Sequence, residues 1–142
     1  MNNFFEQSKK QFGEQFLNFI DIRTLTLKSA QIFRQLARGQ INIEEEGQYF
    51  LNQNLLEAMI NSANAKYELH YISANGLQYQ QLDMANKGIE IDSKCLAIME
   101  YHKKCAQGYQ LILNTMINIR NTRDTSCLYY LVNSLSNYRN YI

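Results

Sequence analysis

The chain has 142 residues, 46% of them hydrophobic, with no Pro, no Trp and a single Val, Val132. Because the commonest helix breaker is absent and a favoured strand residue is almost absent, this composition argues against sandwiches and barrels and favours long helices. Fourteen Lys and Arg against thirteen Asp and Glu give a net charge of +1. The whole chain therefore carries no electrostatic signature of nucleic-acid binding, and residues 1–142 are expected to form one domain.

The first predicted helix starts at Asn2 or Asn3, either of which can cap it, and runs to about Arg38. Gly39 is expected to end this helix of about 34 residues. Its inner face is predicted from residues that recur at spacings of three, four and seven: Phe12, Phe16, Phe19, Thr26, Ala30, Phe33 and Ala37. Asn42 followed by Glu44, Glu45 and Glu46 is typical of the first turn of a second helix.

From Tyr49 onward the apolar period becomes regular, with steps of four and three that define one uninterrupted coiled-coil seam. The seam consists of Tyr49, Gln53, Leu56, Ile60, Ala63, Tyr67, His70, Ala74, Leu77, Gln81, Met84, Gly88, Ile91, Cys95, Ile98, His102, Cys105, Tyr109, Ile112, Met116 and Ile119. As a single helix this stretch would be a rod on the order of 105 Å long. A compact chain must therefore fold it back on itself.

Two glycines compete as the site of that fold-back. Folding at Gly76 would place residue i opposite about 151 − i, and folding at Gly88 would place it opposite about 172 − i. We favour Gly88, because Asp92 and Ser93 follow it and provide a start signal for the next helix, whereas nothing does so after Gly76. On this prediction His70 and His102 meet.

A polar run from Arg120 to Asp124 ends the seam, and Thr125 or Ser126 can cap a last helix with Leu128, Leu131, Leu135 and Tyr138 on one side. The predicted fold is therefore all-α, without β-sheet. We expect an elongated antiparallel helical bundle of three long helices plus a shorter C-terminal helix, packed along coiled-coil-like seams.

The only two histidines both lie on the seam, and they are the sharpest candidates for chemistry. Facing imidazoles can bind haem axially, and with Cys105 and Cys127 they could form a tetrahedral zinc site. Two polar residues that set the helix register are the more ordinary interpretation. We therefore expect no catalytic residue, cofactor or metal, with His70, His102, Cys105 and Cys127 as the alternative metal ligands.

Motifs of enzymes are absent. The spacings Glu68 to His70 and Glu100 to His102 do not match the Glu-x-x-His signature of di-iron bundles, and the six glycines stand apart from any phosphate-binding motif. Cys95 and Cys105 occupy seam positions typical of small core residues rather than nucleophiles. A non-enzymatic protein is the prediction.

The leading functional prediction is an assembly or adaptor subunit that binds helices of itself or of a partner, and forms a homo-oligomer. An amphipathic coat on a lipid or polymer-granule surface and a haem or zinc bundle are the alternatives. No signal peptide and no membrane-spanning segment are expected, so three cysteines are predicted to be reduced in a cytoplasmic protein. An injected effector without a cleavable signal stays open.

Overall fold

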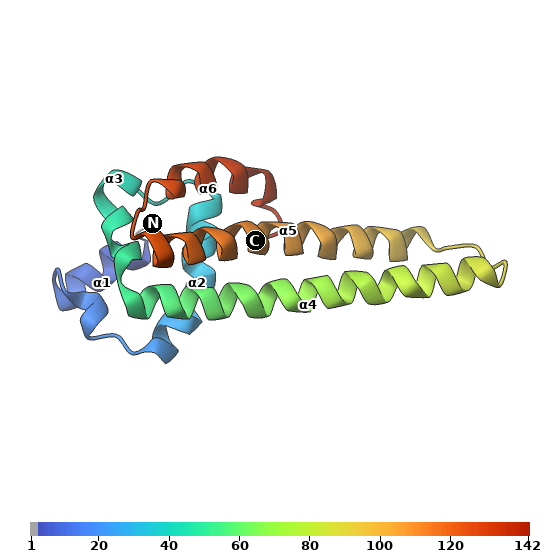
Figure 1. The fold of residues 1–142 in the computed structure, drawn as a ribbon, viewed down its shortest axis with the longest axis horizontal. Coiled ribbons are helices and arrows are strands. Elements are labelled where there is room, and N and C mark those ends of the chain that lie inside the picture. The colour runs from blue at the N-terminus through green and yellow to red at the C-terminus, as the bar shows by residue number, and fades with distance from the viewer. Residues whose placement is uncertain (1–2) are drawn as a thin grey trace.

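A computed structural model describes residues 3–142, which form six α-helices and no strand (Figure 1). The helices are α1 (Phe4–Phe12), α2 (Ile22–Ala37), α3 (Ile43–Glu46), α4 (Gln53–Asn86), α5 (Ser93–Thr122) and α6 (Cys127–Leu135). Three short 3-10 segments, Phe16–Asn18, Gly47–Leu51 and Ser136–Tyr138, join or extend them. The prediction of an all-helical fold is confirmed for this part of the chain.

The long first helix predicted from the apolar period is wrong, because α1 and α2 are separate helices. Gly13 ends α1 in a positive-φ conformation, at 83°, that favours glycine. Asp21 then starts α2 by accepting a hydrogen bond from the Thr24 amide. Phe12 and Phe19 are consequently exposed instead of facing a core, whereas Phe16 is fully buried in the connection between the two helices. Three long helices were expected, but only α4 and α5 are longer than 16 residues.

Asn3 caps α1 as expected, and Asn2 lies outside the described residues. The Asn3 Oδ1 accepts from the Glu6 amide at 2.9 Å, while its Nδ2 donates to the buried Glu46 carboxylate at 2.9 Å. Asn42 caps α3 as predicted, by accepting from the Glu45 amide. One polar cluster therefore ties the start of the chain to the four-residue helix α3.

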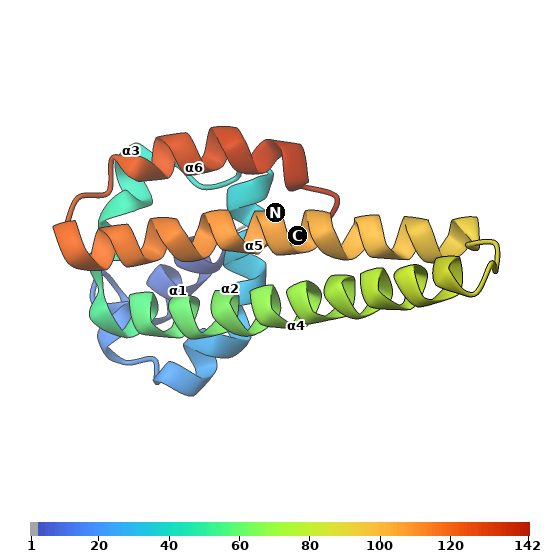
Figure 2. The same cartoon turned by 45° about the vertical axis from the view of Figure 1, so that its right-hand side comes forward.

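The fold-back lies at Gly88, as favoured by the sequence. Gly88 has φ 70°, and the Ile89 amide returns to the Met84 carbonyl at 2.9 Å, an arrangement typical of a glycine-terminated helix. Asp92 caps α5 by accepting from the Lys94 amide. Helix α4 continues through Gly76, so α4 and α5 lie side by side with a reversal of the chain between them (Figures 1 and 2).

The core lies at the end of the hairpin where α4 begins and α5 ends, and α1, α2, α3 and α6 all gather there (Figure 1). Six predicted seam residues of this end are part of that core, namely Leu56, Ala63, Tyr109, Ile112, Met116 and Ile119, and the partly buried Ile60 packs against it. Helix α6 adds Leu128, Leu131 and Leu135 from the predicted face, although Ser126 at its start forms no side-chain cap.

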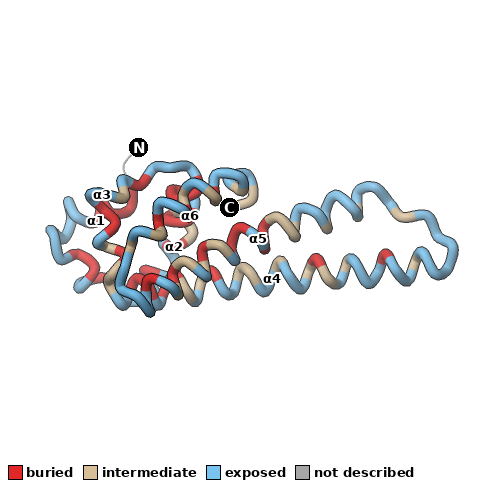
Figure 3. The backbone as a smooth tube through the Cα atoms, turned by 45° about the horizontal axis from the view of Figure 1, so that its top comes forward, coloured by how far each residue is buried: buried red, intermediate tan, exposed pale blue. Residues whose placement is uncertain are grey.

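The rest of the hairpin projects from this core as a two-helix arm, which we define as residues 69–102 (Figure 3). Only Ala74 and Gln81 are buried in the arm. The seam register holds less well here, because the predicted seam residue Ile98 is 51% exposed. Two helices alone cannot enclose both sides of a seam, so the arm lacks a core of its own.

Candidate functional site

A histidine pair marks the point where the packed end of the hairpin gives way to the arm. The Nδ1 atoms of His70 on α4 and His102 on α5 lie 2.9 Å apart, which is a hydrogen-bond distance. One ring must therefore donate an Nδ1–H, and the other must accept with an unprotonated Nδ1. His70 and His102 therefore meet, as predicted for a turn at Gly88.

Tyrosine rings surround the pair. The Tyr109 ring stacks on His70 at a centroid distance of 5.8 Å and an interplanar angle of 3°. Tyr101 contacts both imidazoles edge to face, at centroid distances of 6.2 Å to His70 and 5.4 Å to His102. Lys66 lies over the Tyr109 ring, with its Nζ atom 5.5 Å from the ring centroid. Aromatic packing thus fixes the orientation of the shared hydrogen bond.

The surroundings of His70 favour its uncharged form. Burial, followed by the nearby His102 and Lys66, lowers the pKa of His70. Protonation of both rings would bring two N–H groups against each other and remove the only acceptor between them. The hydrogen bond therefore needs one unprotonated Nδ1 atom, and it forms a polar contact between α4 and α5.

The geometry does not match either metal alternative. A haem iron with two axial imidazoles must lie between one nitrogen of each ring, but the two Nδ1 atoms are in direct contact and leave no room for an iron between them. Cys105 lies in the middle of α5, about 25 Å along the axis from the end of that helix, and Cys127 begins α6 beyond that end. Within residues 3–142, no three His, Cys, Asp or Glu side chains come together to hold a metal ion.

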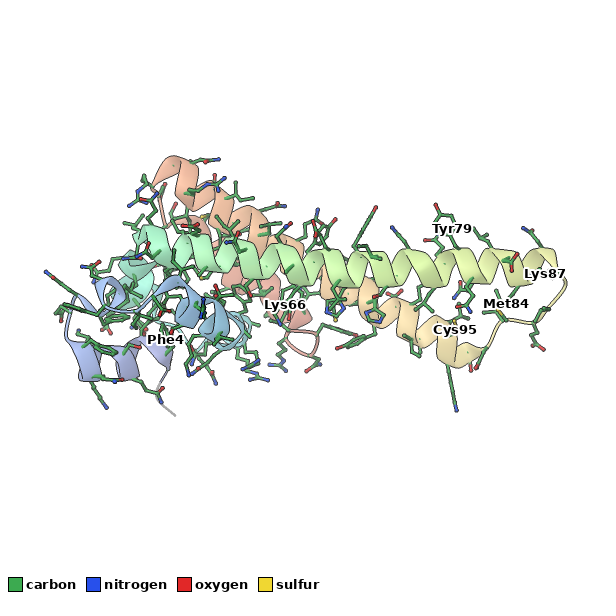
Figure 4. The ribbon with its side chains drawn as sticks, turned by 90° about the horizontal axis from the view of Figure 1, so that it is seen from below. Phe4, Lys66, Tyr79, Met84, Lys87 and Cys95 are labelled. Atoms are coloured by element: carbon green, nitrogen blue, oxygen red, sulfur yellow. The ribbon has the colours of Figure 1, made fainter. Side chains whose placement is uncertain are left out.

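The cysteines do not form a nucleophilic site with the histidines. Cys105 is fully buried, and burial raises the pKa of its thiol, with the Tyr101 hydroxyl acting in the opposite direction. A thiol in this state stays protonated and unreactive. Cys95 is partly buried in the arm, where it lies between α4 and α5 together with Met84 (Figure 4).

A second stripe of residues runs along α4 on the side away from α5. This outer stripe consists of Leu69, Ile72, Gly76 and Tyr79. Its spacings of three and four match those of the seam. Ile72 and Tyr79, however, each lie two positions from a seam residue, and this offset turns their side chains about 160° away from the seam around the helix axis. Figure 4 shows Tyr79 pointing away from α5. Leu69 is 62% exposed, Ile72 67% and Tyr79 74%.

This part of α4 carries no charge. No Asp, Glu, Lys or Arg occurs from Leu69 to Leu82, roughly four turns of helix. A helix that faces water on one side normally presents charged residues there. Near the middle of the stripe, a Cβ added to Gly76 would have no atom within 4 Å, so the α4 backbone is open to close approach from outside.

The outer stripe was not predicted from the sequence, because apolar residues at spacings of three and four were assigned only to the seam that faces the other helix. The absence of charge from Leu69 to Leu82 is the signal that could have found it. Within residues 3–142, no helix combines the length and the apolar character needed to cross a membrane. The exposed apolar residues of the arm are therefore not part of a spanning segment of that kind.

Comparison of the chain with family models, with curated proteins and with solved structures gave no match.

Proposed function

We propose that this chain is a non-enzymatic assembly subunit that associates with a second copy of itself through helix–helix contact. The outer stripe of α4 forms that contact. The observation that carries the proposal is the row of exposed apolar side chains on an uncharged helix face that no other element of the described chain covers. Such a face gains free energy when it is removed from water.

The charge pattern favours a second copy over an unrelated partner. Most homo-oligomeric contacts are two-fold symmetric, so each surface patch meets an identical patch. A charged stripe would then meet its own charge, and the repulsion would oppose association. The stretch from Leu69 to Leu82 avoids this repulsion, while the charged residues Asp83 and Lys87 pair with each other near the tip.

The shape of the stripe supports an arrangement in which the two α4 helices cross at Gly76. Because Gly76 has no side chain, the two backbones can approach closely there. An antiparallel crossing at this residue places Ile72 of one copy next to Tyr79 of the other, on both sides of the crossing point. A large aromatic side chain beside a branched aliphatic one is a favourable pair in interfaces.

The test measures the molar mass of the wild type and of two variants by sedimentation velocity over a wide range of protein concentration. Wild-type protein is expected to change reversibly from monomer to dimer as the concentration rises. Ile72→Glu places a charge against the Tyr79 side chain of the other copy, and it is expected to weaken dimerisation at least tenfold, which is about 1.4 kcal/mol. Leu27→Glu is the matched control, because Leu27 is 77% exposed but lies on α2, away from the arm.

The outcomes separate the proposal from its alternatives. Wild-type protein that stays monomeric at every concentration would overturn self-association, as would equal weakening by the two variants. Flotation of the protein with lipid vesicles, lost in Ile72→Glu, would instead favour the coat function. A far-ultraviolet circular dichroism spectrum checks that both variants stay folded, as expected for substitutions at exposed positions.

A further inference from the structure

A groove of about 600 Å³ lies at the end of the hairpin opposite to the arm. The first turns of α4 form one side of it, and the last turn of α5 with the residue that follows forms the other. This volume is within the range of sites for small organic ligands. The groove is distant from the outer stripe, so self-association through the arm would leave it accessible.

Two arginines from the end of α5, Arg120 and Arg123, line the groove. Within residues 3–142, neither guanidinium group forms an ion pair or a side-chain hydrogen bond. Glu57 lines the same groove but is not within 4 Å of either charge. Two positive charges three residues apart repel each other, and an oxyanion between them would relieve that repulsion and accept their N–H donors.

The backbone at Arg123 is an independent indication. Arg123 has φ 58° and ψ 24°, and it is the only described non-glycine residue with a positive φ. Glycine is the usual residue at this position beyond a helix end, because a Cβ makes the left-handed conformation unfavourable. The chain carries an arginine here despite this conformational cost.

Two apolar residues also line the groove. Leu56 is buried, and Ile60 is partly buried beside it. Gln53 and Asn61 supply amide groups to the lining, and the Glu57 carboxylate can accept a hydrogen bond. The lining therefore combines one strongly positive part, one apolar part and a few neutral polar groups, the composition expected of a site for an organic acid.

We propose that this groove binds a small organic anion. Its carboxylate or phosphate group lies between the Arg120 and Arg123 guanidinium groups, and its apolar body covers Leu56 and Ile60. Arginine matches both kinds of oxyanion with paired N–H donors, so the two groups share the recognition chemistry and are distinguished by experiment. A hydroxyl or amine on the ligand would point toward Glu57.

The test is a titration followed by ¹H–¹⁵N correlation spectra of the full chain, with phenyl phosphate, benzoate, inorganic phosphate and benzyl alcohol as probes. At least one aromatic anion is expected to cause saturable shifts at the start of α4 and the end of α5. Phenyl phosphate and benzoate identify the preferred oxyanion. Inorganic phosphate is expected to bind at least tenfold more weakly, and benzyl alcohol is expected to cause no saturable shift.

Two variants test the arginines. Arg120→Ala and Arg123→Gly are each expected to weaken binding of the aromatic anion at least tenfold, and Arg123→Gly keeps a residue suited to the backbone conformation. Arg139→Ala, which removes an arginine outside the groove, is expected to leave binding unchanged. No saturable shift with either aromatic anion, or equal affinity in all variants, would overturn the proposal. Inorganic phosphate binding as tightly as the aromatic anions would reduce the site to an adventitious ion only.

Discussion

His70 and His102 share a hydrogen bond between their Nδ1 atoms, 2.9 Å apart, at the base of the arm. Each imidazole comes from a different long helix, and the Tyr109 ring stacks on His70. Because the arm beyond them buries only Ala74 and Gln81, this polar contact supports the register of α4 and α5 where apolar burial is small. Its dependence on a single shared proton makes it sensitive to pH.

We predict that the stability of the fold falls as the pH drops below the ordinary histidine value of 6.5. The pKa of His70 is lowered in the folded protein, mainly by burial and then by His102 and Lys66. The unfolded chain therefore binds more protons in this range, so the contribution of the neutral His70 ring is complete above pH 6.5 and is lost as the pH falls below it. Urea unfolding between about pH 5 and 8 measures a change of roughly 1 kcal/mol, the worth of one hydrogen bond.

The control for this prediction is the double variant His70→Gln with His102→Gln, which keeps a polar pair that does not titrate. The relevant quantity is the difference between the wild-type and variant curves, because other groups also titrate. Burial raises the pKa of Glu46, for example, and this effect favours stability at lower pH. Parallel curves for the two proteins would show that the histidine pair makes no such contribution.

Gly76→Ala is predicted to have opposite effects on folding and on self-association. Alanine is favoured over glycine inside a helix by about 1 kcal/mol, and the added Cβ meets no atom within 4 Å. The free energy of unfolding should therefore rise, while the methyl group should separate two α4 helices that cross there and weaken dimerisation. Urea unfolding at low protein concentration and sedimentation velocity measure the two effects separately.

Gly108→Ala is the matched control inside α5. A Cβ at Gly108 would approach the Ile142 Cδ1 to 2.7 Å and the Tyr138 Cβ to 3.2 Å, so the helix-propensity gain should be offset by displacement of the C-terminal residues. Equal stabilisation by the two substitutions would contradict this account of the packing. Unchanged dimerisation of Gly76→Ala would contradict close approach at the crossing point.

Asn3→Asp is predicted to destabilise the protein at neutral pH, although it keeps the cap of α1. An aspartate can still accept from the Glu6 amide, but it replaces the Nδ2 donor to Glu46 with a second carboxylate. We expect a loss of about 1–3 kcal/mol that becomes smaller as the pH is lowered, because one of the two carboxyl groups then takes up a proton.

Asn52→Asp provides the comparison, since Asn52 caps α4 by accepting from the Leu55 amide and donates to no carboxylate in the structure. Aspartate is an equally good cap, so this variant should be as stable as the wild type. Thermal unfolding of both variants at two pH values measures the difference. Equal behaviour of the two would show that the bond between Asn3 and Glu46 does not contribute.

Arg123→Gly is predicted to stabilise the fold by about 1 kcal/mol, because glycine adopts the left-handed conformation of this position without the steric cost of a Cβ. Urea unfolding measures the gain. Arg120→Ala, at a helical position one turn earlier, should not stabilise the protein in the same way. A loss of stability in Arg123→Gly would indicate that the arginine side chain supports the fold itself.

The sequence predicted the hairpin because local signals and the apolar period agreed there. Gly88 supplies the helix end, and Asp92 supplies the next cap. The break between α1 and α2 was missed because Phe12, Phe16 and Phe19 continue a helical period across Gly13, and this period outweighed the glycine and the Asp21 cap. A period reports which residues are apolar, but not whether the backbone stays helical between them.

The groove was not predicted, although the Gly88 turn already places the first turns of α4 opposite the last turns of α5. In the sequence, Arg120 and Arg123 belong to a polar run that ends the seam. Leu56 and Ile60 are predicted only as seam residues. The register of the hairpin indicates which turns of α4 and α5 are neighbours, but not which side chains outside the seam line a groove between them. The histidine pair was predictable because it depends only on the position of one turn.

Helix α4 runs without a break from Gln53 to Asn86, and its length sets the distance between the groove and the proposed crossing point. About 35 Å of helix axis separates Gln53, at the groove, from Gly76, at the proposed crossing. Two copies that cross there hold their grooves up to about 70 Å apart, one at each end of the dimer. A single small anion could occupy only one groove at a time, whereas an extended chain that carries acidic groups could engage both and gain avidity only if it spans that length. Helix α4 then acts as a spacer.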